Sequence, residues 1–198
     1  MPGQKYHDAT GTLSLMKNSA YRIGLEAPDY FAPKKKRMSN EDDFNLFFIN
    51  CSDGPTWDDL QKVLENPHLG YSSAPDIKAF LDLQLDLENP FWRGYFTHLI
   101  GDKLAYQCGA VNMELFKKDC EEIGQDNAKK QLHHDWDVLN GVLDSMYQIE
   151  LTEEIAVLSI VQYSDGEAQY VDINLLIEQI EKIRDCATVD ELILLTTE

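Results

Sequence analysis

The residues best suited to chemistry in this sequence form the run His-His-Asp-Trp-Asp in the second half of the chain. His133, His134, Asp135 and Asp137 belong to this run, and His98 lies upstream of it. Imidazole nitrogens and carboxylate oxygens are the ligands that zinc, manganese and iron ions take in proteins. On a helix, His133 and Asp137 lie one turn apart, whereas His134 lies about 100° further round the axis. The run therefore indicates either a divalent-metal site completed by a second element or a locally hydrogen-bonded cluster without an ion.

The order of these groups along the chain, His98, then His134 and Asp135, then Asp172, is similar to the H…HD…D pattern of HD-type metal phosphohydrolases. The resemblance implies a metal-dependent hydrolase built as a bundle of helices. Two features depart from the family pattern: a Trp-Asp-Val continuation replaces the usual apolar-Gly-Lys after the HD pair, and Asp172 falls in or beside an expected hairpin. The sequence contains no GxSxG, GxxxxGK[ST], GxGxxG, HExxH or CxxC motif.

The candidate metal ligands of the second half lie on a long helix predicted over residues 126–154. Its apolar residues recur every three or four positions, which is the spacing of one buried stripe. The stripe consists of Leu132, Trp136, Leu139, Val142 or Leu143, Met146 and Ile149. Asp126 is expected to cap the first turn of this helix, with Asn127 as the alternative.

The elements on either side of this helix are expected to be mixed. Short apolar runs predict strands at residues 13–16, 20–25, 45–51 and 154–163, the last returning through an Asp-Gly turn as a hairpin over residues 168–173. Capping residues and apolar spacing predict helices at residues 56–65, starting at Thr56, at 90–108, starting at the Asn89-Pro90 pair and with a kink or break near Gly101, and at 113–123 and 173–186. Residues 79–88 fit both periods, and helix is favoured. Thr188 to Glu191 fit the cap of a last short helix, although residues 192–197 fit an edge strand equally.

Together these elements predict an α+β fold, in which a helical middle is flanked by N-terminal short strands and by a C-terminal antiparallel β-hairpin plus helix. Two prolines and abrupt charge blocks at residues 26–43 indicate a surface loop or linker. The chain is therefore expected to divide into a basic, partly flexible N-terminal segment, residues 1–43, and a single acidic globular domain, residues 44–198.

The charge of the chain is strongly asymmetric. The net charge is −18 over 198 residues. Residues 1–40 carry seven basic and three acidic residues, a net charge of +4, whereas residues 41–198 carry ten basic and thirty-two acidic residues, a net charge of −22. Such a surface repels nucleic acid and anionic membranes and attracts basic proteins. We therefore expect no direct contact with nucleic acid or membrane, and a basic protein partner such as a nuclease or a DNA- or RNA-binding protein.

Carboxylates recur about once per turn through the helical middle, and carboxylates held on rigid helices can imitate a row of phosphates. An interleaved aromatic side chain can anchor such an interface. The predicted partner-binding residues are Asp58, Asp59, Asp76, Asp82, Asp86, Glu88, Trp92, Glu121 and Glu122.

These features favour a non-enzymatic acidic protein-binding module, an inhibitor or nucleic-acid mimic of the kind found among immunity and anti-defence proteins, without catalytic residues or cofactor. The alternative from another class is a metal-dependent hydrolase of the HD-phosphohydrolase type. Its divalent ion would be held among His98, His133, His134, Asp135 and Asp137. A third hypothesis is a structural subunit of a larger assembly, and a homo-oligomer is compatible with all three.

The compartment is expected to be intracellular and cytoplasmic. The four cysteines are widely spread and form no CxxC pair, the N-terminus lacks a secretory signal pattern, and no apolar run approaches the roughly 20 residues that span a bilayer. Lys34, Lys35, Lys36 and Arg37 resemble a monopartite nuclear import signal. A nuclear location through these four residues is the alternative to a solvated basic loop.

Overall fold

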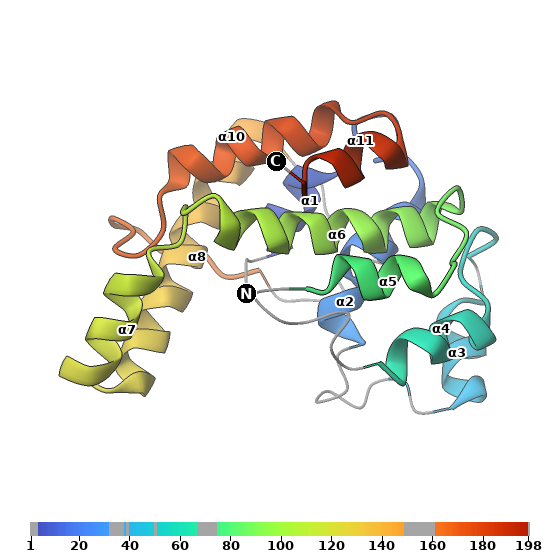
Figure 1. Ribbon diagram of the computed structural model, residues 1–198, viewed down its shortest axis with the longest axis horizontal. Helices are drawn as coiled ribbons and strands as arrows, with labels where there is room; N and C mark the ends of the chain where they lie inside the picture. The colour runs from blue at the N-terminus through green and yellow to red at the C-terminus, as the bar shows by residue number, and fades with distance from the viewer. Residues whose placement is uncertain are drawn as a thin grey trace.

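The computed structural model describes residues 4–31, 38, 40–49, 51–66, 75–148 and 161–197. Within these ranges every regular element is an α-helix (Figure 1). In chain order the helices are α1 (Gln4–Thr10), α2 (Ser19–Tyr30), α3 (Glu41–Phe47), α4 (Trp57–Leu64), α5 (Ile77–Asp82), α6 (Pro90–Gln107), α7 (Met113–Glu122), α8 (Gln125–Tyr147), α10 (Ile173–Asp185) and α11 (Val189–Leu194). No helix of the described ranges has the length and apolar character needed to cross a bilayer.

The predicted α+β class is wrong, because the described residues form helices and no sheet. Residues 13–16 are a turn, and residues 20–25 lie inside α2. Most of the run at 45–51 belongs to α3 and the turn after it. The returning strand of the predicted hairpin is reduced to an isolated antiparallel bridge between Val171 and Val111. Of the other strand, residues 154–160 lie outside the described residues, and residues 161–163 carry no regular structure.

Helix capping explains why these runs become helices. Asn18 and Asn40 sit immediately before α2 and α3, and the side-chain oxygen of each accepts a hydrogen bond from the backbone N–H three residues later. Each cap satisfies one of the N–H groups that a helix leaves unpaired at its start. Three acidic residues in the first turn of α3 also favour a helix, because they face the positive end of its dipole. A short apolar run that begins after such a cap therefore forms a helix, even where its β-branched residues favour a strand.

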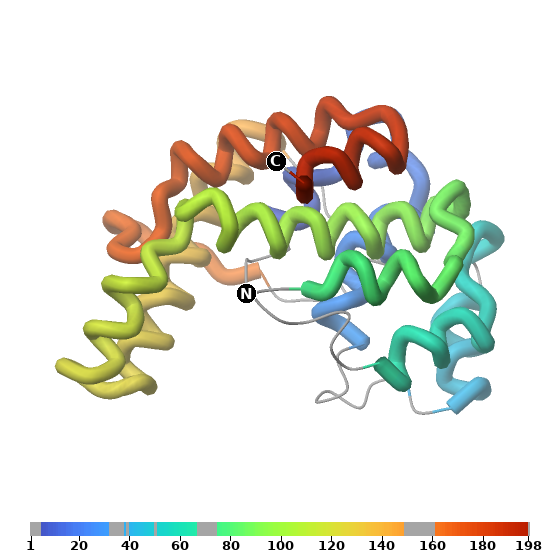
Figure 2. The backbone as a smooth tube through the Cα atoms, viewed as in Figure 1, coloured from blue at the N-terminus to red at the C-terminus, as the bar shows by residue number. Residues whose placement is uncertain are grey.

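Helix α6 is the central element of the fold (Figure 2). Its start is the predicted Asn89-Pro90 pair, in which Asn89 accepts hydrogen bonds from the N–H groups of Phe91 and Trp92. The helix continues without the break expected near Gly101, because Gly101 lies where the ring of Tyr6 packs and needs no change of backbone direction. Nearly every residue of α6 is buried, so other helices cover it on all sides.

The closest of these neighbours is α2, which crosses α6 at two glycines. A Cβ atom added at Gly24 would clash with the carbonyl oxygen of Phe91, and one added at Gly94 would clash with that of Tyr21. The two backbones therefore approach more closely than any larger residue would allow. This crossing fixes the relative position of residues further along both helices.

The apolar core falls into two clusters. One lies between α6 and the helices α2 to α5, α10 and α11, and is rich in aromatic rings such as those of Phe80 and Tyr95, which stack at 5.4 Å. The other joins α1, α8 and α10 around Trp136, Leu139 and Ile180. Helices α7 and α8 pair as an arm at one end of the molecule, and α3 and α4 lie at the opposite end (Figure 1).

The remaining boundaries differ from the predictions in smaller ways. Helix α8 is preceded by Gly124 rather than capped by Asp126, and it ends at Tyr147, where Gln148 adopts a left-handed conformation. Residues 77–82 form α5, so the helix favoured for residues 79–88 is confirmed only as far as Asp82, and residues 83–89 form turns and irregular structure. Of the predicted N-terminal segment, residues 4–31 form α1 and α2 and pack into the core.

Candidate functional site

The one upstream histidine that the sequence singled out, His98, lies in a buried cluster with residues from two other helices. His98 comes from α6, His7 from α1 and Asp29 from α2. Ring nitrogens and a carboxylate oxygen of these three residues lie within 4.8 Å of one another. The imidazole rings of His7 and His98 stack with centroids 3.6 Å apart and an interplanar angle of 13°. Both histidines are fully buried, whereas Asp29 is partly exposed.

A second carboxylate faces both rings. Asp102 lies one helical turn after His98 and is 1% exposed. Its Oδ2 lies 3.4 Å from Nε2 of His98, and its Oδ1 lies 3.8 Å from Nε2 of His7. The Asp102 carboxylate therefore faces the Nε2 edge of both rings, beside the three residues whose possible ligand atoms lie within 4.8 Å of one another.

The hydrogen bond of His98 determines which of its nitrogens faces the cluster. Its Nδ1 lies 2.6 Å from the carbonyl oxygen of Leu25. A carbonyl oxygen only accepts, so Nδ1 carries the hydrogen and donates it, and Nε2 is turned towards Asp102. Burial lowers the pKa of the His98 imidazole, but Asp102, Asp29 and the Leu25 carbonyl outweigh burial and raise it overall. The same arrangement, with Nδ1–H held by a carbonyl, orients the Nε2 lone pair of many metal-bound histidines.

Three contacts hold α1 and α2 against α6 at this site. The hydroxyl of Tyr6 donates to the carbonyl oxygen of Gly101 at 2.9 Å. The hydroxyl of Tyr21 accepts from the N–H of Thr12 at 3.0 Å and lies 3.3 Å from the hydroxyl of Thr97, to which it donates. Together with the Gly24–Gly94 crossing, these contacts place His7 and Asp29 beside His98.

Further charged side chains of α1, α2 and α6 are buried, among them Asp8, Arg22, Glu26 and Arg93. Burial raises the pKa of Asp8 to about 6, although Arg22 and Lys5 favour its ionised form. The ammonium group of Lys5 pairs with Asp144 of α8 at 2.6 Å. Buried charges at this density are costly unless they are matched, and they are typical of functional sites.

The other predicted metal ligands lie on α8 and have other roles. Asp135 is fully buried, and its carboxylate accepts hydrogen bonds from the Gln131 side chain and from the backbone N–H groups of Gln169 and Tyr170. It therefore anchors the segment before α10 to α8. His133 is exposed, and His134 is half-buried beside Gly166.

Asp137, the last of the predicted ligands on α8, is half-buried, and burial raises the pKa of its carboxyl despite His133 and His134 nearby. Of the predicted set, only His98 belongs to the three-residue group that the described part of the chain brings within ligand distance of one another. Asp172, the last member of the HD-like order, accepts from the N–H groups of Asn174 and Leu175 as the cap of α10.

Sequence reasoning missed His7, Asp29 and Asp102. His7 lies in a polar stretch without apolar spacing, and Asp29 follows Pro28 in a segment assigned to a loop. The spacing of His98 and Asp102, one helical turn apart, was the one available signal.

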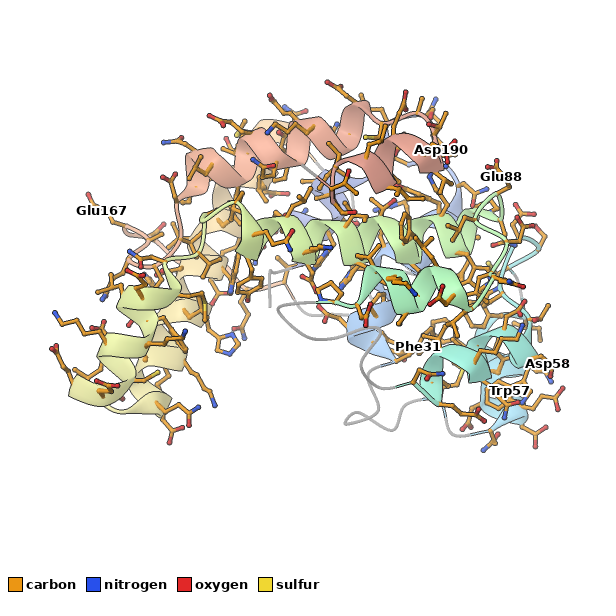
Figure 3. All side chains as sticks on the ribbon, in the orientation of Figure 1. Phe31, Trp57, Asp58, Glu88, Glu167 and Asp190 are labelled. Atoms are coloured by element: carbon orange, nitrogen blue, oxygen red, sulfur yellow. The ribbon has the colours of Figure 1, made fainter. Side chains whose placement is uncertain are left out.

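The predicted partner-binding residues form two separate groups. Asp58, Asp76, Asp82, Asp86 and Glu88 are exposed near α4 and α5, and Figure 3 shows Asp58 and Glu88 at the same end of the molecule.

Three further members of the set occupy other settings. Glu121 and Glu122 are exposed on α7, at the opposite end from α4 (Figure 1). Asp59 is partly buried and pairs with Lys62, which lowers the pKa of its carboxyl through a hydrogen bond. Trp92 is 2% exposed and packs on Phe91, so its ring belongs to the core.

The comparisons with known proteins leave the site to be interpreted on its own geometry. No protein-family model, no curated protein and no solved structure matches this chain. The described part of the chain is a helical fold with a His/Asp cluster at the meeting of three helices, in which both histidines are buried. The basic residues Lys34, Lys35, Lys36 and Arg37 lie outside the described residues.

Proposed function

We propose that this protein is a divalent-metal-dependent hydrolase whose ion is held by His7, Asp29 and His98. The observation that carries the proposal is the convergence of two imidazoles and one carboxylate from three helices, with ligand atoms within 4.8 Å of one another. Two histidines and one carboxylate are a donor set found in catalytic zinc sites. Hydrolysis needs only the ion and water, and an ion bound to such a set lowers the pKa of its water to about 7.

Asp102 acts as a positioning residue in this proposal. Its two carboxylate oxygens face the Nε2 atoms of both histidines, and its side chain is buried. Leu25 holds the other side of the His98 ring through its carbonyl oxygen. A carbonyl in this place orients a metal-ligating histidine, because it binds the ring N–H opposite the ligating nitrogen, whereas the Asp102 carboxylate would lie beside the ion that Nε2 holds.

Asp29 is the member of the cluster nearest to solvent, because His7 and His98 are fully buried and Asp29 is partly exposed. Substrate is therefore expected to reach the cluster from the C-terminal end of α2. Asp29 would both complete the ligand set and border the open coordination position that a catalytic site keeps.

The test is hydrolysis of chromogenic esters and phosphodiesters by the purified protein, before and after chelation and after return of zinc or manganese. We expect activity that chelation abolishes, that the returned ion restores, and that His98→Gln lowers by at least about a hundredfold, since a ligand substitution removes the ion. His133→Gln, an exposed histidine on α8, is the matched control and should retain activity. Activity that survives both chelation and His98→Gln would contradict the proposal.

A second function is favoured by the exposed carboxylates Asp58, Asp76, Asp82, Asp86 and Glu88 near α4 and α5. We propose that this group docks on a basic protein, such as a nuclease or a nucleic-acid-binding protein. Attraction of this kind weakens as salt screens the charges. The proposal would be supported if a basic protein is captured from lysate at low salt and released at high salt. The same protein should not be captured by the triple variant Asp82→Asn, Asp86→Asn, Glu88→Gln. Binding indifferent to these changes would refute it.

A further inference from the structure

A second cavity, separate from the His7–Asp29–His98 cluster, lies where α1, α2, α8 and α10 meet. Its volume is about 330 Å³. Asp8 and Arg22 contribute to its wall from α1 and α2, Tyr147 from the end of α8, and Arg184 from α10. Leu13, Met16 and Gln148 line the rest of the cavity. The cavity therefore combines two guanidinium groups and one carboxylate with an apolar rim.

Arg184 is held in a fixed orientation at this cavity. Its Nη1 donates a hydrogen bond to the carbonyl oxygen of Ala9 at 2.8 Å, and its guanidinium carbon lies 4.5 Å from the ring centroid of Tyr147. A guanidinium has five N–H donors, and within the described residues this is the one hydrogen bond that Arg184 makes. A guanidinium fixed by stacking retains donors with the fork geometry that binds oxyanions.

Asp8 supplies an acceptor that the protein itself does not satisfy. Its side chain is 0% exposed, and neither carboxylate oxygen accepts a hydrogen bond from any described residue. Leaving a buried carboxylate without a donor costs free energy, which a ligand that brings a donor would recover. The positive charges of Arg22 and Arg184 disfavour a metal ion in this cavity and favour an anion. The hydrogen bond that Asp8 could accept is therefore expected from a donor group on an anionic ligand.

We propose that this cavity binds hydrogen phosphate, with its anionic oxygens accepting from Arg184 and its remaining O–H donating to Asp8. Phosphate fits both halves of the cavity because it carries acceptors and one hydroxyl at about pH 8. Sulfate has the same shape and charge but carries no hydroxyl at that pH, so it leaves Asp8 unsatisfied and places unpaired oxygens against it. The site is distinct from the proposed metal centre and does not depend on it.

The experiment is isothermal titration of the full chain with inorganic phosphate and, separately, with sodium sulfate, at about pH 8 and constant ionic strength. We expect phosphate to bind at least about tenfold more tightly than sulfate, because one buried charge-assisted hydrogen bond is made only with phosphate. Arg184→Gln should weaken phosphate binding by about tenfold or more. Lys118→Gln removes the same charge from exposed α7 and should leave the affinity unchanged.

Asp8→Asn tests the role of the carboxylate, because an amide can donate to sulfate. It should lower the ratio of phosphate to sulfate affinity to near one. Two results would indicate an adventitious ion only: equal affinity of the wild-type protein for the two anions, or an unchanged phosphate affinity in Arg184→Gln. Either result overturns the proposal, and so does the absence of phosphate binding. If His98→Gln abolishes phosphate binding and Arg184→Gln leaves it intact, the phosphate binds at the metal centre. This result also overturns the proposal.

Discussion

The imidazole rings of His7 and His98 lie parallel, 3.6 Å apart, although they come from opposite ends of the first half of the chain. Two imidazolium ions stacked at this distance would repel each other. Asp102 faces the Nε2 atoms of both rings. Asp102 therefore lies at the ring edges through which the two histidines would bind a divalent ion.

Asp102→Asn should weaken metal binding without removing it. The substitution keeps the shape of the side chain but removes the negative charge that faces His7 and His98. Loss of an outer partner of this kind lowers metal affinity by about 10–100-fold. Competition with a chromogenic zinc chelator measures the change. An affinity equal to that of the wild-type protein would mean that Asp102 has no part in the site.

The contact between α2 and α6 should be intolerant of a single methyl group. In Gly24→Ala the new Cβ would clash with the carbonyl oxygen of Phe91, which cannot move without shifting α6. We expect the free energy of unfolding to fall by about 3 kcal/mol or more. Gly141→Ala is the control, since nothing lies within 4 Å of its added Cβ inside α8. It should stabilise the protein by about 0.5–1 kcal/mol, and urea unfolding measures both changes.

Asp135→Asn should affect stability and not the metal site. The Asp135 carboxylate accepts from the backbone N–H groups of Gln169 and Tyr170, and an amide replaces one of its two acceptor oxygens by a donor. We expect a loss of about 2–3 kcal/mol in the free energy of unfolding. Metal content, measured by elemental analysis of the folded variant, should equal that of the wild-type protein. Loss of metal together with an unchanged stability would restore Asp135 as a ligand.

Tyr170 should make the protein less stable at high pH. Its hydroxyl donates to Asp119 at 2.7 Å, and burial, together with this carboxylate, raises the pKa of Tyr170 to about 12, from the usual value of about 10. The folded state therefore holds the phenolic proton more tightly than the unfolded chain does. The stabilisation is complete below about pH 10 and is lost as the pH rises towards 12. The unfolding midpoint should fall less steeply across this range in Tyr170→Phe than in the wild-type protein.

Local sequence signals predicted the helices well where a cap and an apolar stripe coincided. The Thr56 cap before α4, the Asn89-Pro90 start of α6 and the Thr188–Glu191 capping box before α11 are all confirmed. The strands were wrong at residues 20–25 because a short apolar run fits both periods. Its structure is decided by the Asn18 cap, which is a local signal, and by the contact of Gly24 with α6, which is a tertiary contact that no local pattern reveals.

The candidate site was harder to predict than the fold. His98 was singled out from the sequence by its place in the H…HD…D order, and that order paired it with residues of α8. Its actual neighbours, His7 and Asp29, come from segments without apolar spacing, and they are brought to His98 by the crossing of α2 over α6. Contacts of this kind depend on tertiary packing, so periodicity and motif spacing cannot supply them.

The central claim is most directly tested by the metal stoichiometry of the purified protein. We would saturate it with zinc, remove loosely bound ions by gel filtration, and measure zinc per chain by elemental analysis in the wild-type protein, His7→Gln, His98→Gln and the control His133→Gln. We predict about one tightly bound zinc ion per chain in the wild-type and control proteins, and little in the two ligand variants, provided that circular dichroism shows them to be folded. An equal zinc content in His98→Gln and His133→Gln, or no zinc in any of the four, would contradict the account.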